Sequence, residues 1–174
     1  MTDVSLKPRD FLGDAGALAR ALADRHEPRE QQLRMAEAVA SAMDGARTLL
    51  VEAGTGVGKS FAYLAPALER ILTFGERVVV STNTIALQEQ LVSKDIPVLQ
   101  RALAESGRTF KAVLVKGRGN YVSVRRLKLA SERQDKLFAD AASRRSLHVI
   151  EDWAYSTTDG TLSTLPALDR VAVW

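Results

Sequence analysis

The sequence predicts an α/β fold in which a parallel sheet is flanked by helices. Three short apolar runs alternate with helical segments, and the connections between them have the dozen or more residues that parallel strands require. The runs are TLLVEA (48–53), RVVVST (77–82) and KAVLVKG (111–117). They are apolar without alternation, which is typical of strands covered on both faces. A sheet of this kind usually has about five strands or more, so we expect an incomplete domain.

Two helices are predicted before the first run. Residues 14–25 carry leucines four positions apart, with Asp14 as the expected N-cap. Residues 29–43 form the second helix, which Gly45 ends. Its apolar stripe consists of Leu33, Ala36, Val39 or Ala40, and Met43.

The rest of the chain is predicted to be helical between and after the strands. The segments are 60–74, 84–96, 98–107 and most of 121–155, followed by a polar turn region over 156–166. Pro66 is expected to kink or strain the first segment, Pro97 to end the second and Gly107 to close the third. The final ALDRVAVW is an apolar run without a terminator, which also indicates a truncated domain.

The composition is that of a soluble globular domain with a core. The 174 residues are 46% hydrophobic and 26% charged. No apolar run approaches the roughly 20 residues of a membrane span, and MTDVSLKPRD lacks the layout of a signal peptide. We therefore expect a cytoplasmic protein. The absence of cysteine excludes a disulfide or a thiolate metal site within these residues.

A block of positive charge occupies residues 111–148, although the net charge of the whole chain is only +3. The block holds ten Lys and Arg residues and three acids, a balance of +7 that leaves the rest of the chain at −4. Such a block indicates a surface that faces a polyanion, and it is equally typical of a solvated helix face.

Residues 53–60, AGTGVGKS, follow the first predicted strand and open a predicted helix. We expect a phosphate-binding loop there, because a triphosphate needs a curved cradle of backbone N–H groups and a helix N-terminus directed at the anion. Lys59 is expected to contact the β- and γ-phosphates and Ser60 to ligate Mg²⁺, so these are the predicted catalytic residues. The predicted nucleotide-binding residues of the loop are Ala53, Gly54, Thr55, Gly56, Val57, Gly58, Lys59 and Ser60. The alternative is a glycine-rich turn with a chance Lys-Ser pair.

Arg29 and Gln32 are candidates for recognising the base of the nucleotide. They lie three residues apart at the start of a predicted helix, upstream of the loop. The Gln amide offers both a donor and an acceptor, which suits the adenine edge, and the Arg side chain can stack on the base or hold the helix end. The alternative is a pair of exposed polar residues on an amphipathic helix.

A polar stretch, STNTIALQEQL (81–91), follows the second predicted strand. The C-terminal ends of parallel strands form the ligand-binding rim of such a sheet. Thr82, Asn83 and Gln88 are therefore candidate contacts to a phosphodiester backbone. Contacts of this kind carry no information about the base sequence. N-capping by Thr82 or Thr84 is the alternative interpretation.

The stretch GRGNYVSVRRL (117–127) follows the third predicted strand and lacks the Lys-Ser or Lys-Thr pair of a second phosphate loop. Arg118, Arg125 and Arg126 are expected to form a basic grip of the kind that binds single-stranded nucleic acid, with Tyr121 available to stack on a base. These residues do not distinguish DNA from RNA. The alternative is a basic turn that enters a solvated helix.

These stretches together resemble superfamily 2 DNA helicases of the DinG/XPD type, in their bacterial DinG-like branch. EPREQQLRMAEAV, which contains Arg29, Gln32 and Met35, resembles the adenine-reading segment, and EAGTGVGKSFAYLAPAL resembles motif I. VVVSTNTIALQEQLVSKDIPVL resembles motif Ia, and VLVKGRGNYVSVRRL resembles the segment that enters the iron–sulfur domain. The resemblance covers roughly residues 11–127, and the ordered set of four motifs is more specific than motif I alone.

The resemblance implies an ATP- and Mg²⁺-dependent enzyme that translocates 5′ to 3′ on single-stranded or forked DNA and unwinds duplexes in repair or replication. Two positions depart from the family pattern. His26 stands where an aromatic residue usually stacks on adenine, and Ser123 stands where iron–sulfur members have the first cysteine ligand. Serine is a poor ligand for such a cluster. Either this branch lacks the cluster, or it has other ligands after residue 174, or the position is altered in this sequence.

Neither an acidic DEAH-like run nor the second RecA-like domain with its arginine finger occurs in the 174 residues. We therefore expect these residues alone to bind nucleotide weakly and not to unwind DNA. The expected organisation is N-terminal helices with the adenine segment over 1–47 and the first part of a P-loop NTPase (RecA-like) domain over 48–120. The helical start of an iron–sulfur or arch-type insertion is expected over 121–174.

Two other classes of function stay open. One is another P-loop ATPase or a nucleotide or small-molecule kinase. A kinase would need a lid and substrate-binding acids after the second strand, where this chain has STNTIALQEQL. The other is a non-catalytic nucleic-acid-binding module with a vestigial loop, against which the intact Lys59-Ser60 pair argues.

Overall fold

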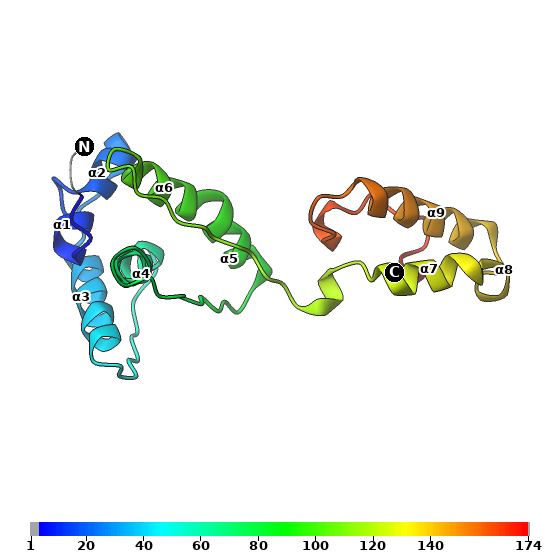
Figure 1. The fold of residues 1–174 in the computed structure, drawn as a ribbon, viewed down its shortest axis with the longest axis horizontal. Helices are drawn as coiled ribbons and strands as arrows, with labels where there is room; N and C mark the ends of the chain where they lie inside the picture. The colour runs from blue at the N-terminus through cyan, green and yellow to red at the C-terminus, as the bar shows by residue number, and fades with distance from the viewer. Residues whose placement is uncertain (1–3, 174) are drawn as a thin grey trace. The chain divides into compact units, whose positions relative to one another are not determined.

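The computed structural model describes residues 4–173, which form two compact units (Figure 1). Unit 1 extends to Leu114 and unit 2 begins at Val115. The elements of unit 1 are α1 (Pro8–Leu12), α2 (Ala17–Leu22), the 3₁₀ turn η1 (Ala23–Arg25), α3 (Glu30–Asp44), α4 (Lys59–Phe74), α5 (Ile85–Gln90), the π-helical turn η2 (Leu91–Asp95) and α6 (Ile96–Ala104). Those of unit 2 are η3 (Arg118–Asn120), α7 (Val124–Glu132), α8 (Gln134–Leu137), α9 (Ala141–Ser156), η4 (Leu162–Thr164) and η5 (Val171–Val173). None of the helices within residues 4–173 has the length and apolar character needed to cross a bilayer.

The core of unit 1 lies between its helices. α3 packs against α4, α2 packs against α6, and α1 contacts α2, α3 and α4. Phe11, Leu18, Leu99 and Leu103 are fully buried in this core. Burial of a leucine or phenylalanine side chain stabilises a fold by about 1.5–3 kcal/mol. The core therefore fixes α3 and α4, the two helices that precede and follow the phosphate loop.

These two helices form where the sequence predicts them. α3 ends at Gly45, and its predicted stripe includes the fully buried Ala36. α4 begins at Lys59 and ends at Gly75, whose φ of +68° is the left-handed conformation common after a helix. Pro66 lies inside α4 and is buried in the core.

The expected strands are the main correction to the sequence analysis. In the structure the runs 48–53, 77–82 and 111–117 are irregular, and within residues 4–173 no strand and no parallel sheet is present. Apolar side chains of these runs face solvent: Leu50 is 96% and Val79 is 87% exposed. A strand exists only when its N–H and C=O groups pair with a neighbouring strand. The backbone hydrogen bonds of the described residues include no pairing between these runs.

Two predicted helix boundaries also differ. Asp14 is not an N-cap, because α2 begins at Ala17 after Gly16, and the Asp14 carboxylate lies 3.4 Å from Nε2 of His26. Pro97 does not end the preceding helix. The chain continues from α5 through η2 into α6, where Pro97 is the second residue. Proline is tolerated in the first turn of a helix because its missing N–H has no helical partner there.

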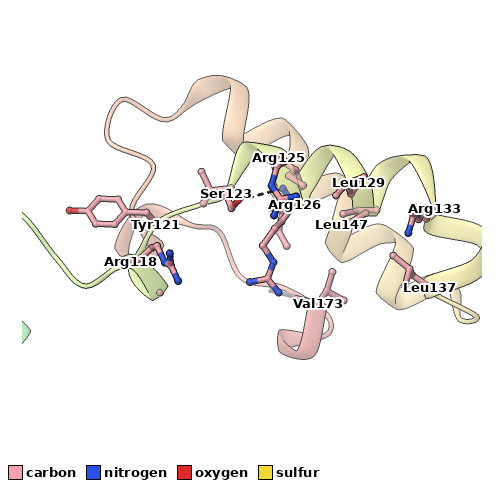
Figure 2. A pocket seen from close by; sticks show the side chains of 15 residues that line it. Arg118, Tyr121, Ser123, Arg125, Arg126, Leu129, Arg133, Leu137, Leu147 and Val173 are labelled. Carbon is pink, nitrogen blue, oxygen red and sulfur yellow. Dashed lines mark hydrogen bonds between the residues drawn. The ribbon is translucent and has the colours of Figure 1, made fainter.

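Unit 2 is built around α9, against which α7 and η5 pack (Figures 1 and 2). α9 buries Leu147, Ile150 and Trp153. Its N-terminus is capped by Asp140, whose carboxylate accepts a hydrogen bond from the Ser143 N–H at 2.8 Å. The prediction that most of residues 121–155 are helical is confirmed.

Candidate functional site

The phosphate loop enters α4 with the backbone geometry that the motif predicts. Gly56 and Gly58 both have a φ of +81°, in the left-handed region that favours glycine. Gly58 is the N-cap of α4, and in the described structure no side chain caps this end of the helix. The first-turn N–H groups and the positive end of the helix dipole are therefore available to an anion.

The ammonium group of Lys59 bridges the two ends of the loop. Its Nζ donates hydrogen bonds to the carbonyl oxygens of Ala53 at 3.0 Å and Gly54 at 2.7 Å. The side chain is exposed, so the charge lies at the solvent-facing side of the loop. The Lys59 ammonium is thus held within the eight-residue motif by neutral carbonyl oxygens. A phosphate oxygen attracts the ammonium more strongly and could replace these carbonyls as its partner.

Gln32 joins α3 to this loop. It is 5% exposed, and its Nε2 donates a hydrogen bond to the Gly58 carbonyl at 2.9 Å. The approach is close, because a Cβ added to Gly58 would lie 2.0 Å from Nε2 of Gln32. Position 58 therefore favours glycine for its φ, and a side chain there would also displace the Gln32 amide. The predicted base-recognition residue and the predicted phosphate loop lie together in the structure.

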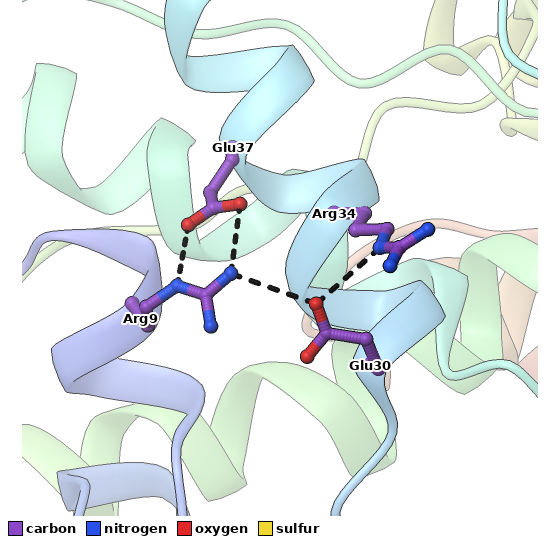
Figure 3. Close-up of polar contacts among 4 residues, drawn as sticks. All are labelled: Arg9, Glu30, Arg34 and Glu37. Carbon is purple, nitrogen blue, oxygen red and sulfur yellow. Dashed lines mark hydrogen bonds and ion pairs between the residues drawn. The ribbon is translucent and has the colours of Figure 1, made fainter.

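Ion pairs hold α3 against α1 (Figure 3). The Arg9 guanidinium donates two hydrogen bonds to the Glu37 carboxylate, at 2.7 and 3.2 Å, and lies 3.6 Å from Glu30. Arg34 also contacts Glu30, at 3.3 Å. The hydrogen bonds from Arg9, with its charge, lower the pKa of Glu37. All four side chains are exposed, so the pairs orient α3 more than they stabilise it.

The other residues of the predicted adenine segment differ in their surroundings. Arg29 is the N-cap residue of α3, donates a hydrogen bond to Glu27 and lies beside Gly58. His26 faces Asp14, as described above, and Met35 is half-buried against the core. Arg29 therefore lies near the loop together with Gln32, whereas the His26 ring is held at the α1–α2 connection.

Ser60, the predicted Mg²⁺ ligand, lies in the first turn of α4 near Tyr63. Burial raises the pKa of Tyr63, and the nearby Asp95 charge raises it further, whereas the Ser60 hydroxyl beside it lowers it. Tyr63 thus stays a neutral phenol at physiological pH, next to the predicted metal ligand.

The stretch 81–91 leads into α5. Thr84 is the N-cap: its Oγ1 accepts a hydrogen bond from the Leu87 N–H at 3.2 Å. Thr82 supports the same turn, because its hydroxyl donates to the Thr84 carbonyl at 3.1 Å. Asn83 is exposed and Gln88 is half-buried. Capping by Thr84, one of the two interpretations of this stretch, is thus confirmed.

In unit 2, the predicted grip residues Arg118, Arg125 and Arg126 line one cavity of about 1020 Å³ (Figure 2). The described lining contains no acidic residue. Its apolar part includes Leu127, Leu129, Leu137, Leu147, Ile150 and Val173. Cationic side chains around an apolar floor suit a ligand that has both an anionic and an apolar part, as a nucleotide chain has.

Tyr121 also lines this cavity, but its hydroxyl is fixed elsewhere. The Tyr121 Oη accepts a hydrogen bond from the Lys116 N–H at 2.8 Å, and Tyr121 forms an antiparallel bridge with Thr161. Figure 2 shows its ring pointing away from Arg125 and Arg126. Only the ring face is therefore left to stack on a base.

Arg133 is a cavity residue that the sequence analysis did not select. It follows α7 and stands seven positions after Arg126, which is about two helical turns. This spacing can be read from the sequence, and it predicts that the two guanidinium groups lie on the same face of the helix.

Comparison with known proteins identifies the family. Residues 31–130 match the DEAD/DEAH box helicases. The chain belongs to this family. Membership implies a P-loop NTPase fold, and the span that matches contains Gln32, the phosphate loop, the 81–91 stretch and the three cavity arginines of the prediction.

Curated relatives confirm the resemblance to DinG-type helicases. The ATP-dependent DNA helicase YoaA of Escherichia coli is 40% identical over 89% of this chain and 23% of its own length. YoaA of Haemophilus influenzae is 41% identical over 76% of this chain and 19% of its own length. The ATP-dependent helicase DinG of Mycobacterium tuberculosis H37Rv is 42% identical over 76% and 22%. The chain thus spans about a fifth of the length of these relatives. No solved structure matches it.

Proposed function

We propose that the protein is an ATP-dependent DNA helicase of the DinG type, and that this chain supplies its phosphate loop and part of its DNA grip. The observation that carries the proposal is the start of α4. The glycine-rich loop there contains two left-handed glycines and a lysine, and it leads into a helix N-terminus without a side-chain cap. A buried glutamine of the preceding helix, Gln32, donates a hydrogen bond to this loop. A chance turn has no reason to combine these features.

In this proposal ATP binds with its phosphates in the curve of residues 53–60. Lys59 exchanges the Ala53 and Gly54 carbonyls for β- and γ-phosphate oxygens, and Ser60 holds Mg²⁺. Arg29 and Gln32 meet the adenine side. Because Gln32 already contacts Gly58, the occupation of the base site and the shape of the phosphate loop are coupled through one side chain.

The three exposed apolar runs are strands of a parallel sheet in the longer protein. Their solvent-facing valines and leucines lack the two covered faces that such runs need. The relatives are about five times as long as this chain, so further strands and helices can pair with and cover them. The carboxyl ends of the strands would then bring the loop and the 81–91 stretch to one edge.

DNA is proposed to contact two sets of residues. Thr82, Asn83 and Gln88 contact the sugar-phosphate backbone, and the arginines of the unit 2 cavity hold a single strand, whose bases meet the apolar floor. Movement from 5′ to 3′ and a cytoplasmic location belong to the same proposal. The 174 residues lack an acidic DEAH-like run, so they are expected to hydrolyse ATP very slowly on their own.

The full-length protein with Lys59→Ala tests the proposal. We expect ATP hydrolysis in the presence of single-stranded DNA to fall by about 10²–10³-fold, as for loss of one charge-stabilising group. The affinity for single-stranded DNA should stay within about twofold, because none of the proposed DNA contacts is changed. Lys7→Ala, an exposed lysine at the start of α1, is the matched control. Unchanged hydrolysis by Lys59→Ala would reject the proposed role of the loop.

A further inference from the structure

Ser123 has a structural role at the start of α7. It is the N-cap residue, in an extended conformation, and its Oγ accepts a hydrogen bond from the Arg126 N–H at 3.4 Å (Figure 2). The Ser123 carbonyl accepts the first helical hydrogen bond, from the Leu127 N–H at 2.9 Å. A side chain that bonds to the amide three residues later is the usual N-cap arrangement of serine.

The resemblance described above implies that position 123 holds the first cysteine ligand in the iron–sulfur members of that family. Such clusters are held by cysteine thiolates, and the 174 residues contain no cysteine. Within residues 4–173 there is also no group of three or more His, Cys, Asp or Glu side chains that could hold a metal. The side chains of unit 2 therefore do not fit a cluster.

A cluster of hydroxyl groups around Asp159 holds this part of unit 2 together. The Asp159 carboxylate accepts hydrogen bonds from the Thr161 N–H and hydroxyl, both at 2.9 Å, and from the Thr157 hydroxyl at 3.3 Å. The network extends from the Thr161 hydroxyl to Ser163 at 2.8 Å and from Ser163 to the Lys116 ammonium at 3.1 Å.

This Asp159 cluster lies against the segment that leads to Ser123. The Val122 N–H donates to the Gly160 carbonyl at 2.9 Å, and Tyr121 pairs with Thr161. On the other side, Thr164 joins the network to α9. Its hydroxyl donates to the Thr161 carbonyl at 3.0 Å and accepts from Nε1 of Trp153 at 3.2 Å. The cluster therefore connects the entry to α7 with the end of α9.

We propose that Ser123 is a helix cap and not a metal ligand, and that the Asp159 cluster of hydrogen bonds, not a metal centre, joins the entry of α7 to the end of α9. The argument rests on the contacts of unit 2 and does not depend on ATP hydrolysis. A cap needs only a hydrogen-bond acceptor at position 123, whereas a ligand needs an atom that bonds iron. The two roles therefore respond differently to substitution.

The test uses the full-length protein, prepared without air, with iron content and hydrogen exchange as readouts. In Ser123→Asn the side chain can still cap the helix, but its amide is not a ligand for an iron–sulfur cluster. Ser123→Ala removes the cap. We expect the iron content, whatever its wild-type value, to be the same in both variants. Exchange of the amides at 124–127 should rise about fivefold in Ser123→Ala, as for loss of one cap, and stay near wild type in Ser123→Asn. Loss of iron in Ser123→Asn would overturn the cap assignment.

Asp159→Asn tests the second half of the proposal in the same experiment. Exchange in 121–123 and 160–164 is expected to rise several-fold, because the amide cannot accept all the hydrogen bonds of the carboxylate. Asp152→Asn, an exposed aspartate on α9, is the matched control and should leave these peptides unchanged. Protection of 121–123 that is unaffected by Asp159→Asn would overturn the role of the cluster.

Discussion

The starts of α4 and α7 differ in the groups that they would present to a negatively charged ligand. Both follow a glycine-containing segment and an apolar run without regular structure. α4 begins after a left-handed glycine with no side-chain cap in the described structure. α7 begins after Ser123, whose hydroxyl already occupies a first-turn amide. The first helix offers backbone N–H groups to an anion, and the second offers arginine side chains.

This difference separates two kinds of recognition. Backbone groups are fixed in space, so the loop before α4 suits a ligand of one shape, such as the phosphates of a nucleotide. Arginine side chains around an apolar cavity adapt to a chain of varying sequence, as single-stranded DNA is. The loop should therefore be sensitive to small backbone changes and the cavity to charge and salt.

Among the substitutions that keep Lys59, the largest effect is expected for Gly58→Ala in the full-length protein. The new Cβ would meet Nε2 of Gln32 at 2.0 Å, on a residue with a φ of +81°. Left-handed backbone alone costs a non-glycine residue about 1–2 kcal/mol, so ATP affinity should fall by about tenfold or more. Titration with a fluorescent ATP analogue measures it.

Gly75→Ala is the matched control. Gly75 has the same left-handed conformation, with a φ of +68°, at the other end of α4, and a Cβ there would meet nothing within 4 Å. We expect its ATP affinity to stay within about threefold of wild type, because the backbone strain at position 75 lies outside the loop. Equal losses in the two variants would show that the left-handed geometry at position 58 does not shape the site.

A smaller effect, dependent on salt, is expected for the double variant Arg125→Ala/Arg126→Ala. Each lost phosphate contact should reduce the slope of log affinity against log salt by about 0.7 for a single strand, so two contacts reduce it by about 1.4. Lys128→Ala is the control, since Lys128 lies on the same helix and does not line the cavity. If Lys128→Ala changes the slope as much, binding depends on net charge and not on the cavity.

The smallest effect is expected for the pH dependence of local stability around the Asp159 cluster. The hydrogen bonds from the Thr161 backbone and hydroxyl lower the pKa of Asp159. Because the pKa is lower in the folded state, the ionised Asp159 carboxylate stabilises the fold fully when the pH is above the ordinary carboxyl pKa. This stabilisation is lost as the pH falls through the lowered pKa. Hydrogen exchange of 160–164, corrected for its intrinsic pH dependence, should therefore show protection lost in this acid range. Asp159→Asn should remove this pH dependence, and a variant that kept it would point to another titrating group.

The sequence predicted best what depends on local patterns. α3 and α4 follow from apolar spacing and from glycines at their ends, and the phosphate loop follows from its motif. The runs 48–53 and 77–82 were predicted as strands, but pairing depends on partners that no local pattern supplies. Pro97 was misjudged because the π turn before it carries the helix onward.

The candidate site was predicted in part. Gln32 and the loop were selected together, but the contact with Gly58 depends on how α3 packs on α4, which sequence spacing does not specify. Arg133 was missed although helical spacing from Arg126 indicates it. The Asp159 cluster was not foreseen, because its residues looked like an ordinary polar turn.

The most direct test of the account is ATP hydrolysis by the full-length protein, measured against increasing single-stranded DNA for wild type, Lys59→Ala and Arg125→Ala/Arg126→Ala. The account predicts that the lysine variant hydrolyses almost no ATP at any DNA concentration. The arginine variant should keep the rate without DNA and need about tenfold more DNA for half-maximal stimulation, as for about 1.4 kcal/mol of lost binding. An arginine variant with a lost DNA-free rate, or with unchanged DNA dependence, would contradict the division between the loop in unit 1 and the cavity in unit 2.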